Sequence, residues 1–258
     1  MPEFAVVGHP NKGKSSIVAT LAENEDIAIS SRPGTTSKST RFDFSVDGNV
    51  LYTLVDTPGF QRATGVLQWL EAHVEDASNR VDVVRAFVNQ HQDDDRFQDE
   101  CELLRPILDG AGILYVVDGS KPYGPEYEIE MQILQWTGQP RMALINLIGA
   151  GDYQDQWRRA LDQYFSIVRV FNAMFADFDT RTNLLRAFAE LNEDWRGDME
   201  AAIAALQSER SRRLHRSAIE VADALIDCLS YTGQQFVEEG GATDGVAQSL
   251  RNALLQRI

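Results

Sequence analysis

The sequence is poor in cysteine and short of positive charge. Its two cysteines, Cys101 and Cys228, lie far apart and show no metal-ligand spacing, so they indicate neither a disulfide framework nor a zinc site. Its 24 lysine and arginine side chains are outnumbered by 39 aspartates and glutamates, which gives a formal net charge of −15. Because binding along nucleic-acid phosphates needs a concentrated positive face, we expect no broad nucleic-acid binding.

Long apolar runs are also missing. The strongest one, residues 113–117, is far shorter than the roughly 20 residues of a membrane-spanning helix. A strand-like run begins at Phe4, which leaves no room for the charged and apolar regions of a secretory signal. We therefore expect a cytoplasmic protein without a transmembrane segment. Its 43% of hydrophobic residues is enough for a core and excludes disorder throughout the chain.

What the sequence does contain is an alternation of strand-like and helix-like patterns. Strand-like runs lie at 4–7, 112–118, 142–148 and 167–172, and a hairpin is expected over 41–55. Helical patterns separate the later runs. These six strands predict an α/β fold with a mostly parallel sheet, one antiparallel strand and flanking helices.

Two parts of the chain fall outside this alternation. The segment at about 60–110 is too long for an ordinary connection and contains a helical pattern, so we expect an elaborated insertion. After residue 195 only an amphipathic helical pattern follows, which divides the chain into a domain at 1–195 and a helical extension at 196–258. The pattern is unfinished where the sequence stops, which favours a fragment of a longer protein. An arginine cluster at 210–216 leaves peripheral contact with lipid headgroups or acidic protein open.

The strongest functional signal is a phosphate-binding loop. Residues 8–15 read Gly-His-Pro-Asn-Lys-Gly-Lys-Ser, a complete match to G-x-x-x-x-G-K-[ST] between a predicted strand and a predicted helix. The glycines let backbone N–H groups turn toward phosphate oxygens, and the helix N-terminus adds partial positive charge. Lys14 is predicted to reach the β- and γ-phosphates, and the Ser15 hydroxyl to ligate Mg²⁺.

A second signal, Asp56-Thr57-Pro58-Gly59, follows the predicted strand 51–55. Alone it would be a turn, since proline and glycine favour turns. Together with a phosphate loop, an acidic residue at a strand end is placed to approach Mg²⁺, and Gly59 lets its backbone N–H approach a γ-phosphate.

These motifs resemble the Era/EngA/TrmE-like group of translation-factor-related GTPases over about residues 3–195. The matching stretches are 8–16 (GHPNKGKSS), 32–36 (RPGTT), 56–60 (DTPGF), 115–120 (YVVDGS) and 145–149 (INLIG). The resemblance implies a P-loop G domain that binds GTP and GDP, an elaborated switch II at about 60–110 and an unknown protein effector. The chain is most similar to members of unassigned role with long helical C-terminal extensions, and dimerisation stays open.

The resemblance also implies roles for single residues. The threonine that closes over Mg²⁺ corresponds to Thr36, with Thr35 as the neighbouring candidate, and Asp56 would hold the metal through water. Asn11 stands where potassium-stimulated relatives carry an asparagine of a K⁺ site. The implied catalytic residues are Asn11, Lys14, Thr36 and Gly59, the metal ligands are Ser15, Thr36 and Asp56, and the nucleotide-binding residues are Gly8, Asn11, Lys12, Gly13, Lys14, Ser15, Ser16, Asn146, Asn172 and Ala173.

Two positions depart from the family pattern. Phe60 stands where Ras-like enzymes carry a water-orienting glutamine, which predicts slow turnover without K⁺ or a partner. The base-reading motif of the family is N-K-x-D, and this chain has Asn-Leu-Ile-Gly at the corresponding residues 146–149. Gly149 therefore stands in place of the aspartate, and Asp152 substitutes for it only if the loop bends back. Three functions stay open: a Mg²⁺-dependent GTPase switch, which leads, a nucleotide-binding interaction module with little hydrolysis, and an NTPase with relaxed base specificity.

Overall fold

The computed structural model describes residues 1–10, 12–22, 28–33, 39–46, 48–172, 176–230 and 248. The expectations for Asn11, Thr35, Thr36 and Ala173 lie outside the described residues. The chain divides into two compact units, Met1–Leu206 and Gln207–Ile258. The domain boundary expected after residue 195 stays a prediction.

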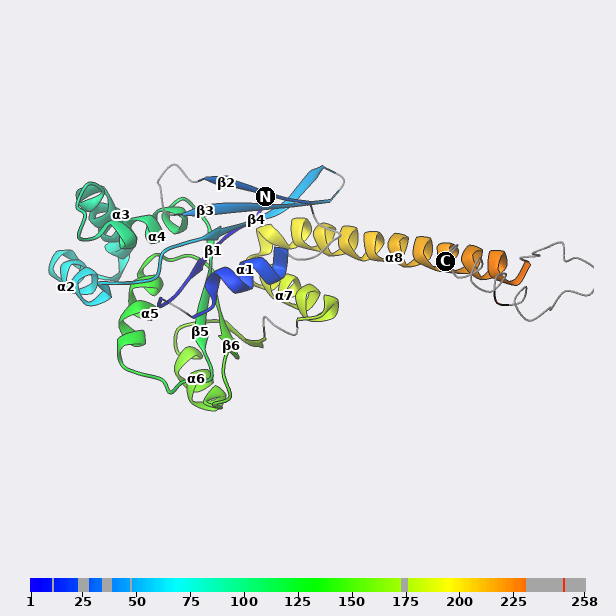
Figure 1. Ribbon diagram of the computed structural model, residues 1–258. Helices are drawn as coiled ribbons and strands as arrows, with labels where there is room; N and C mark the ends of the chain where they lie inside the picture. Colours follow the sequence, from blue (N-terminus) through cyan, green and yellow to red (C-terminus); the bar gives the residue numbers. More distant parts are fainter. Residues whose placement is uncertain are drawn as a thin grey trace, which may run out of the picture. The chain divides into compact units, whose positions relative to one another are not determined.

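A seven-stranded sheet, in the order β2-β3-β4-β1-β5-β6-β7, forms the centre of the first unit (Figure 1). Its strands are β1 (Glu3–Val7), β2 (Ala28–Pro33), β3 (Thr40–Val46), β4 (Asn49–Asp56), β5 (Gly112–Asp118), β6 (Arg141–Asn146) and β7 (Ile167–Phe171). β3 runs antiparallel to β2 and β4, and the other neighbouring strands are parallel. The predicted α/β fold with one antiparallel strand is confirmed.

All six expected strands are present, and β2 is an additional one at the edge of the sheet. Its sequence, Ala-Ile-Ser-Ser-Arg-Pro, has no apolar alternation and ends in a proline. Proline is tolerated at a sheet edge because an edge strand has one side without a hydrogen-bonding neighbour. This strand is therefore recognised by its backbone pairing with β3, and not by a hydrophobic pattern in its sequence.

Helices connect the strands and fill the elaborated segment. They are α1 (Lys14–Ala22), α2 (Ala63–His73), the short 3₁₀ helix η1 (Ala77–Asn79), α3 (Arg80–His91), α4 (Gln98–Leu108), α5 (Glu126–Trp136), α6 (Gln154–Leu161), α7 (Phe178–Leu191) and α8 (Glu193–Ser230). The segment expected to be elaborated thus contains α2, η1, α3 and α4 between β4 and β5.

The sheet is buried on both faces. Along β1, Ala5 and Val7 belong to the core cluster that contains the buried apolar residues of α2 to α6, whereas Phe4 and Val6 belong to the cluster that contains those of α1, α7 and the first turns of α8. This alternation follows from the period of two of a β-strand, and burial on both faces is typical of parallel sheets. The loops that follow parallel strands then meet at one edge of the sheet, where α/β proteins bind their ligands.

The described part of the second unit is the remainder of α8, residues 207–230, and residue 248. Its large apolar side chains are exposed: Leu214, Ile219, Val221, Leu225, Ile226 and Leu229. Across the described ranges, none of the helices combines the length and the apolar character needed to cross a membrane.

Candidate functional site

The loop between β1 and α1 has the backbone that its glycines predict. Gly8 has a φ of +143° and Gly13 a φ of +83°, values that side chains rarely allow. A Cβ at Gly8 would lie 2.4 Å from the Val116 carbonyl oxygen, and a Cβ at Gly13 would lie 2.5 Å from Nδ2 of Asn146. Neither position accepts a side chain without displacing its neighbours. Both positions therefore require glycine, because of the backbone conformation and because of the close neighbouring atoms.

Lys14, the first residue of α1, is folded back over this loop. Its Nζ donates hydrogen bonds of 3.1 Å to the carbonyl oxygens of Gly8 and of His9. Burial lowers the pKa of Lys14, while the nearby Asp56 and Glu130 act to raise it. The lysine is therefore a cation held over the loop by weak neutral acceptors, which an anionic ligand would replace.

Ser15 and Asp56 meet at the side of the loop. The Ser15 hydroxyl donates a 2.6 Å hydrogen bond to Oδ2 of Asp56. Oδ1 of Asp56 is buried and has no hydrogen-bond partner within the described residues. Burial raises the pKa of Asp56, and the Ser15 hydrogen bond and the Lys14 charge oppose that shift. A hydroxyl beside a half-buried carboxylate with one unpartnered oxygen fits Mg²⁺, which binds hard oxygen ligands and keeps several waters.

The residues after Asp56 bring a second loop against the first. Thr57 donates a 2.8 Å hydrogen bond to the Val6 carbonyl oxygen, which ties the end of β4 to β1. A Cβ at Gly59 would lie 2.7 Å from the backbone nitrogen of Pro10. Gly59 thus has no room for a side chain, because it lies directly against Pro10 of the phosphate loop.

The next residues are anchored to α4. Phe60 is buried in the core, so its side chain is turned away from solvent. The backbone N–H groups of Gln61 and Arg62 donate hydrogen bonds of 2.8 and 2.5 Å to Oε1 of Glu100. Glu100 is fully buried, and its Oε2 has no partner in the part of the chain that the structure describes.

The residues expected to read the base are only partly in place. Asn146 is buried and its Nδ2 donates a 3.4 Å hydrogen bond to the Lys12 carbonyl oxygen. Leu147 packs against the core, and the following Ile148 is 47% exposed. A Cβ at Gly149 would lie 2.9 Å from Oγ of Ser120, so this position is crowded. Asn172 directly follows β7.

A cavity of about 420 Å³ lies over the phosphate loop. It is lined by Lys12, Gly13, Lys14, Ser15, Ser16 and Ile148. The last four residues of the G-x-x-x-x-G-K-[ST] motif, Ser16 and an apolar residue that follows Asn146 and Leu147 therefore share one opening. Their roles toward a nucleotide stay predictions.

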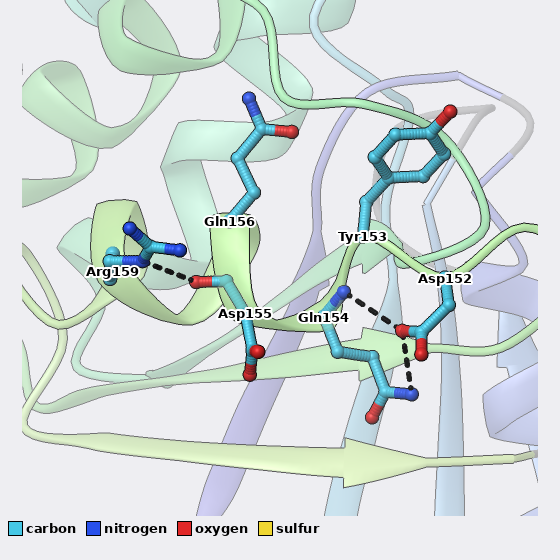
Figure 2. A pocket seen from close by; sticks show the side chains of 6 residues that line it. All are labelled: Asp152, Tyr153, Gln154, Asp155, Gln156 and Arg159. Carbon is cyan, nitrogen blue, oxygen red and sulfur yellow. Dashed lines mark hydrogen bonds between the residues drawn. The ribbon is translucent and has the colours of Figure 1, made fainter.

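Asp152 lies at a different opening, which Figure 2 shows. This cavity of about 360 Å³ is lined by Asp152, Tyr153, Gln154, Asp155, Gln156 and Arg159. Oδ1 of Asp152 accepts hydrogen bonds from the backbone nitrogen and from Nε2 of Gln154, at 3.3 and 3.1 Å. The carboxylate is thus held by Gln154, the first residue of α6, and Asp152 is absent from the residues that line the phosphate-loop cavity.

Sequence reasoning missed Glu100 and Glu130, which are two of the buried glutamates of the described residues. Each lies on the apolar stripe of its helix, at the second of four positions spaced i, i+3, i+4 and i+7. The stripe of α4 begins at Phe97 and that of α5 at Tyr127. A charged residue on such a stripe is a signal for a buried polar contact. Among the described residues, no group of three or more histidines, cysteines or carboxylates is placed to hold a metal ion.

Two family profiles match the chain. The sequence profile of a family described as 50S ribosome-binding GTPase matches residues 3–147, and that of a domain of unknown function, DUF3482, matches residues 158–257.

Curated relatives include two proteins named GTPase Der. The one from Nitrosospira multiformis is 43% identical over 70 residues, which are 27% of this chain and 15% of the relative. The one from Thioalkalivibrio sulfidiphilus is 27% identical over 173 residues, which cover 63% of this chain and 37% of the relative. The chain thus spans well under half the length of these relatives.

Among solved structures, Era from Aquifex aeolicus bound to GDP and AlF4⁻ shares 19% identity with this chain. The superposition covers 73% of this chain and 56% of Era, with a TM-score of 0.46.

Proposed function

Because the chain belongs to the family of 50S ribosome-binding GTPases, we propose that it is a Mg²⁺-dependent molecular switch that binds and hydrolyses GTP. The observation that supports this most is the convergence of four predicted residues on one cavity region. Lys14 and Ser15 line the cavity, Asp56 accepts the Ser15 hydrogen bond, and Gly59 lies against the same loop.

In this proposal the chain's own groups bind and orient the triphosphate. Lys14 leaves the Gly8 and His9 carbonyl oxygens and contacts the β- and γ-phosphates, and the Gly59 N–H contacts the γ-phosphate. Ser15, Thr36 and Asp56 would hold Mg²⁺, and the bound ion would supply positive charge to the phosphates. The loops that carry Thr36 and Gly59 are then ordered by GTP and released after hydrolysis, which is how the switch would signal to a protein effector.

Turnover is proposed to be slow in the isolated chain. Phe60 is buried, so its side chain is not available to orient the attacking water. Asn11 supplies part of a K⁺ site whose charge assists hydrolysis, or a partner or second copy provides the missing group. The burial of Phe60 equally favours a second candidate, a nucleotide-binding interaction module with little hydrolysis.

Potassium dependence separates these candidates. We expect GTP turnover to rise when K⁺ replaces Na⁺ and to lose this response in Asn11→Ala. Equal rates in both salts would contradict the K⁺ site. The missing catalytic group would then have to come from a partner or a second copy. Absence of turnover in either salt, with GTP still bound, would favour the interaction module.

Guanine preference is proposed to survive the loss of the aspartate at position 149. Asn146 and the backbone at Asn172 and Ala173 can still distinguish a carbonyl from an amine at the base. Competition among GTP, ATP and XTP tests this: GTP should win, whereas ATP binding as tightly as GTP would establish the NTPase with relaxed base specificity. Asp152→Asn is the matched variant, and a loss of GTP preference there would show that the loop bends back on binding.

A further inference from the structure

The loop that follows β6 is packed tightly against the loop that follows β5. A Cβ at Gly149 would lie 2.9 Å from Oγ and 3.2 Å from Cβ of Ser120. A Cβ at Gly151 would lie 2.1 Å from the Ser120 carbonyl oxygen. The backbone nitrogen of Tyr153 donates a 3.0 Å hydrogen bond to the Gly119 carbonyl oxygen. Residues 149, 151 and 153 therefore all lie directly against residues 119 and 120.

Ser120 is itself held in place by a buried carboxylate. Its backbone nitrogen and its Oγ donate hydrogen bonds of 3.0 and 2.5 Å to Oδ1 of Asp118, which is 2% exposed. Rotation of the Ser120 hydroxyl away from Gly149 would break one of these hydrogen bonds, and it would leave the Ser120 Cβ where it is. Ser120 thus closes the space beside Gly149.

The backbone does not require glycine at position 149. In contrast to Gly8 and Gly13, Gly149 is not among the glycines with a positive φ. A side chain is therefore excluded there by the contact with Ser120 and not by the backbone conformation. The aspartate of the N-K-x-D motif has no room at this position.

Asp152 does not take the place of that aspartate. Its Oδ1 accepts two hydrogen bonds from Gln154 at the opening that Figure 2 shows. To reach the phosphate-loop cavity, the Asp152 carboxylate would have to lose both bonds, and the contacts of Gly151 and Tyr153 with residues 119 and 120 would have to open. The described residues that line the phosphate-loop cavity accordingly include no carboxylate.

This arrangement decides which groups of a purine base the site can recognise. Guanine and hypoxanthine both carry a carbonyl group at position 6, whereas adenine carries an amino group there. Guanine differs from hypoxanthine by an amino group at position 2, which only donates and is bound most strongly by a carboxylate. The cavity offers Ile148 instead, whose side chain has no hydrogen-bonding atom.

We propose that the nucleotide site recognises the 6-carbonyl group of a purine and not its 2-amino group, so that it binds inosine and guanosine nucleotides equally well. Ser120 is then a specificity-determining residue, because its contact leaves no room for an aspartate at position 149. This inference rests on the proposed function, and it extends the proposed preference over adenine from guanine to 6-oxopurines as a class.

Competition among GDP, inosine diphosphate (IDP) and ADP for the full chain, in the presence of Mg²⁺, tests the proposal. GDP and IDP should bind within about threefold of each other, and ADP at least about tenfold more weakly. A carboxylate that bound the 2-amino group would instead favour GDP over IDP by roughly 10- to 150-fold. Asp152→Asn should leave the ratio of GDP to IDP affinity unchanged.

Two further variants test the role of Ser120. Gly149→Asp alone forces the new side chain against Ser120, so it should not raise the preference for GDP over IDP. Gly149→Asp together with Ser120→Gly supplies both the carboxylate and the space, so it should favour GDP by at least about tenfold. Ser120→Gly alone is the matched control and should keep the wild-type ratio.

The outcomes separate this inference from the proposed function. Wild-type binding of GDP at least about tenfold tighter than IDP would overturn the inference and leave the proposed function intact. ADP binding as tightly as GDP would contradict recognition of the 6-carbonyl group. A gain of GDP preference in Gly149→Asp alone, or no gain in the double variant, would overturn the role of Ser120. If folded wild type bound none of the three nucleotides, the proposed function would fail and this inference with it.

Discussion

Lys14 and Ser15 carry the most direct expectations at the scale of single residues. Lys14→Ala removes the cation that contacts the phosphates, and Ser15→Ala removes a metal ligand, so each should weaken GTP binding in the presence of Mg²⁺. A hydrogen bond to a charged group is worth about 1.5–3 kcal/mol, which corresponds to roughly 10- to 150-fold in affinity.

Equilibrium titration with GTP measures both effects. Ser211→Ala, an exposed serine on α8, is the control and should bind as wild type does. Unchanged affinity in both Lys14→Ala and Ser15→Ala would contradict the assignment of the phosphate loop.

The two thiols should differ in reactivity. Burial raises the pKa of Cys101 to about 11, and its Sγ contacts the Val88 carbonyl oxygen. At pH 8 only about a thousandth of such a thiol is thiolate, the reactive form. A thiol reagent should therefore modify Cys228 in the folded protein and leave Cys101 unmodified until denaturant is added. Rapid modification of Cys101 in the native state would contradict its burial.

The sequence predicts residues whose role follows from a local pattern. Gly8, Gly13 and Lys14 belong to one contiguous motif, and in the structure the two glycines have positive φ while Lys14 donates to the Gly8 carbonyl oxygen. Glu100 and Glu130 have partners 38 and 121 residues away, so the sequence shows that they interrupt an apolar stripe but not what they contact.

At the scale of elements, Glu100 joins α4 to the segment that follows Gly59. Glu100→Ala removes the acceptor of two backbone N–H groups in a buried place and should lower the free energy of unfolding by about 2–4 kcal/mol. Glu100→Gln keeps an acceptor oxygen without a buried charge and should cost less.

Denaturant unfolding measures these differences, and amide hydrogen exchange locates them. In Glu100→Ala the amides of Gln61 and Arg62 should exchange faster, whereas Glu71→Ala, an exposed glutamate of α2, should change neither quantity. Equal stability of Glu100→Ala and wild type would show that the contact contributes nothing.

Elements with strong periodicity are the ones that the sequence predicts well. β5 has the predicted bounds, 112–118, because its side chains are buried on both faces and form a continuous apolar run. β2 escapes prediction because an edge strand needs no such pattern. The segment after β4 was expected to contain helix, but the arrangement of α2, α3 and α4 depends on packing between them that no local pattern encodes.

At the scale of the whole molecule, the compact unit Met1–Leu206 should fold and bind nucleotide by itself. A chain ending at residue 195 loses Met199, Ile203 and Leu206, which are buried in the core cluster that contains Phe4 and Phe188. Burial of such side chains contributes about 1.5–3 kcal/mol each, a large part of the 5–15 kcal/mol that stabilises an ordinary domain.

Thermal unfolding compares the two truncated chains. We expect residues 1–206 to unfold in one cooperative transition and to bind GDP, and residues 1–195 to unfold at a lower temperature. Equal stability of both would place the domain boundary after residue 195, as the sequence predicted.

The central claim is that the cavity over the phosphate loop is a guanine-nucleotide site. Equilibrium titration of the purified chain with GDP, in the presence of Mg²⁺, tests it most directly, with ATP as the competitor. The account predicts saturable binding of about one GDP per chain, as expected for a single P-loop. Excess ATP should displace the GDP poorly, and Lys14→Ala should weaken its binding at least about tenfold. Failure of folded wild-type protein to bind GDP at millimolar concentration, or binding that Lys14→Ala leaves unchanged, would contradict it.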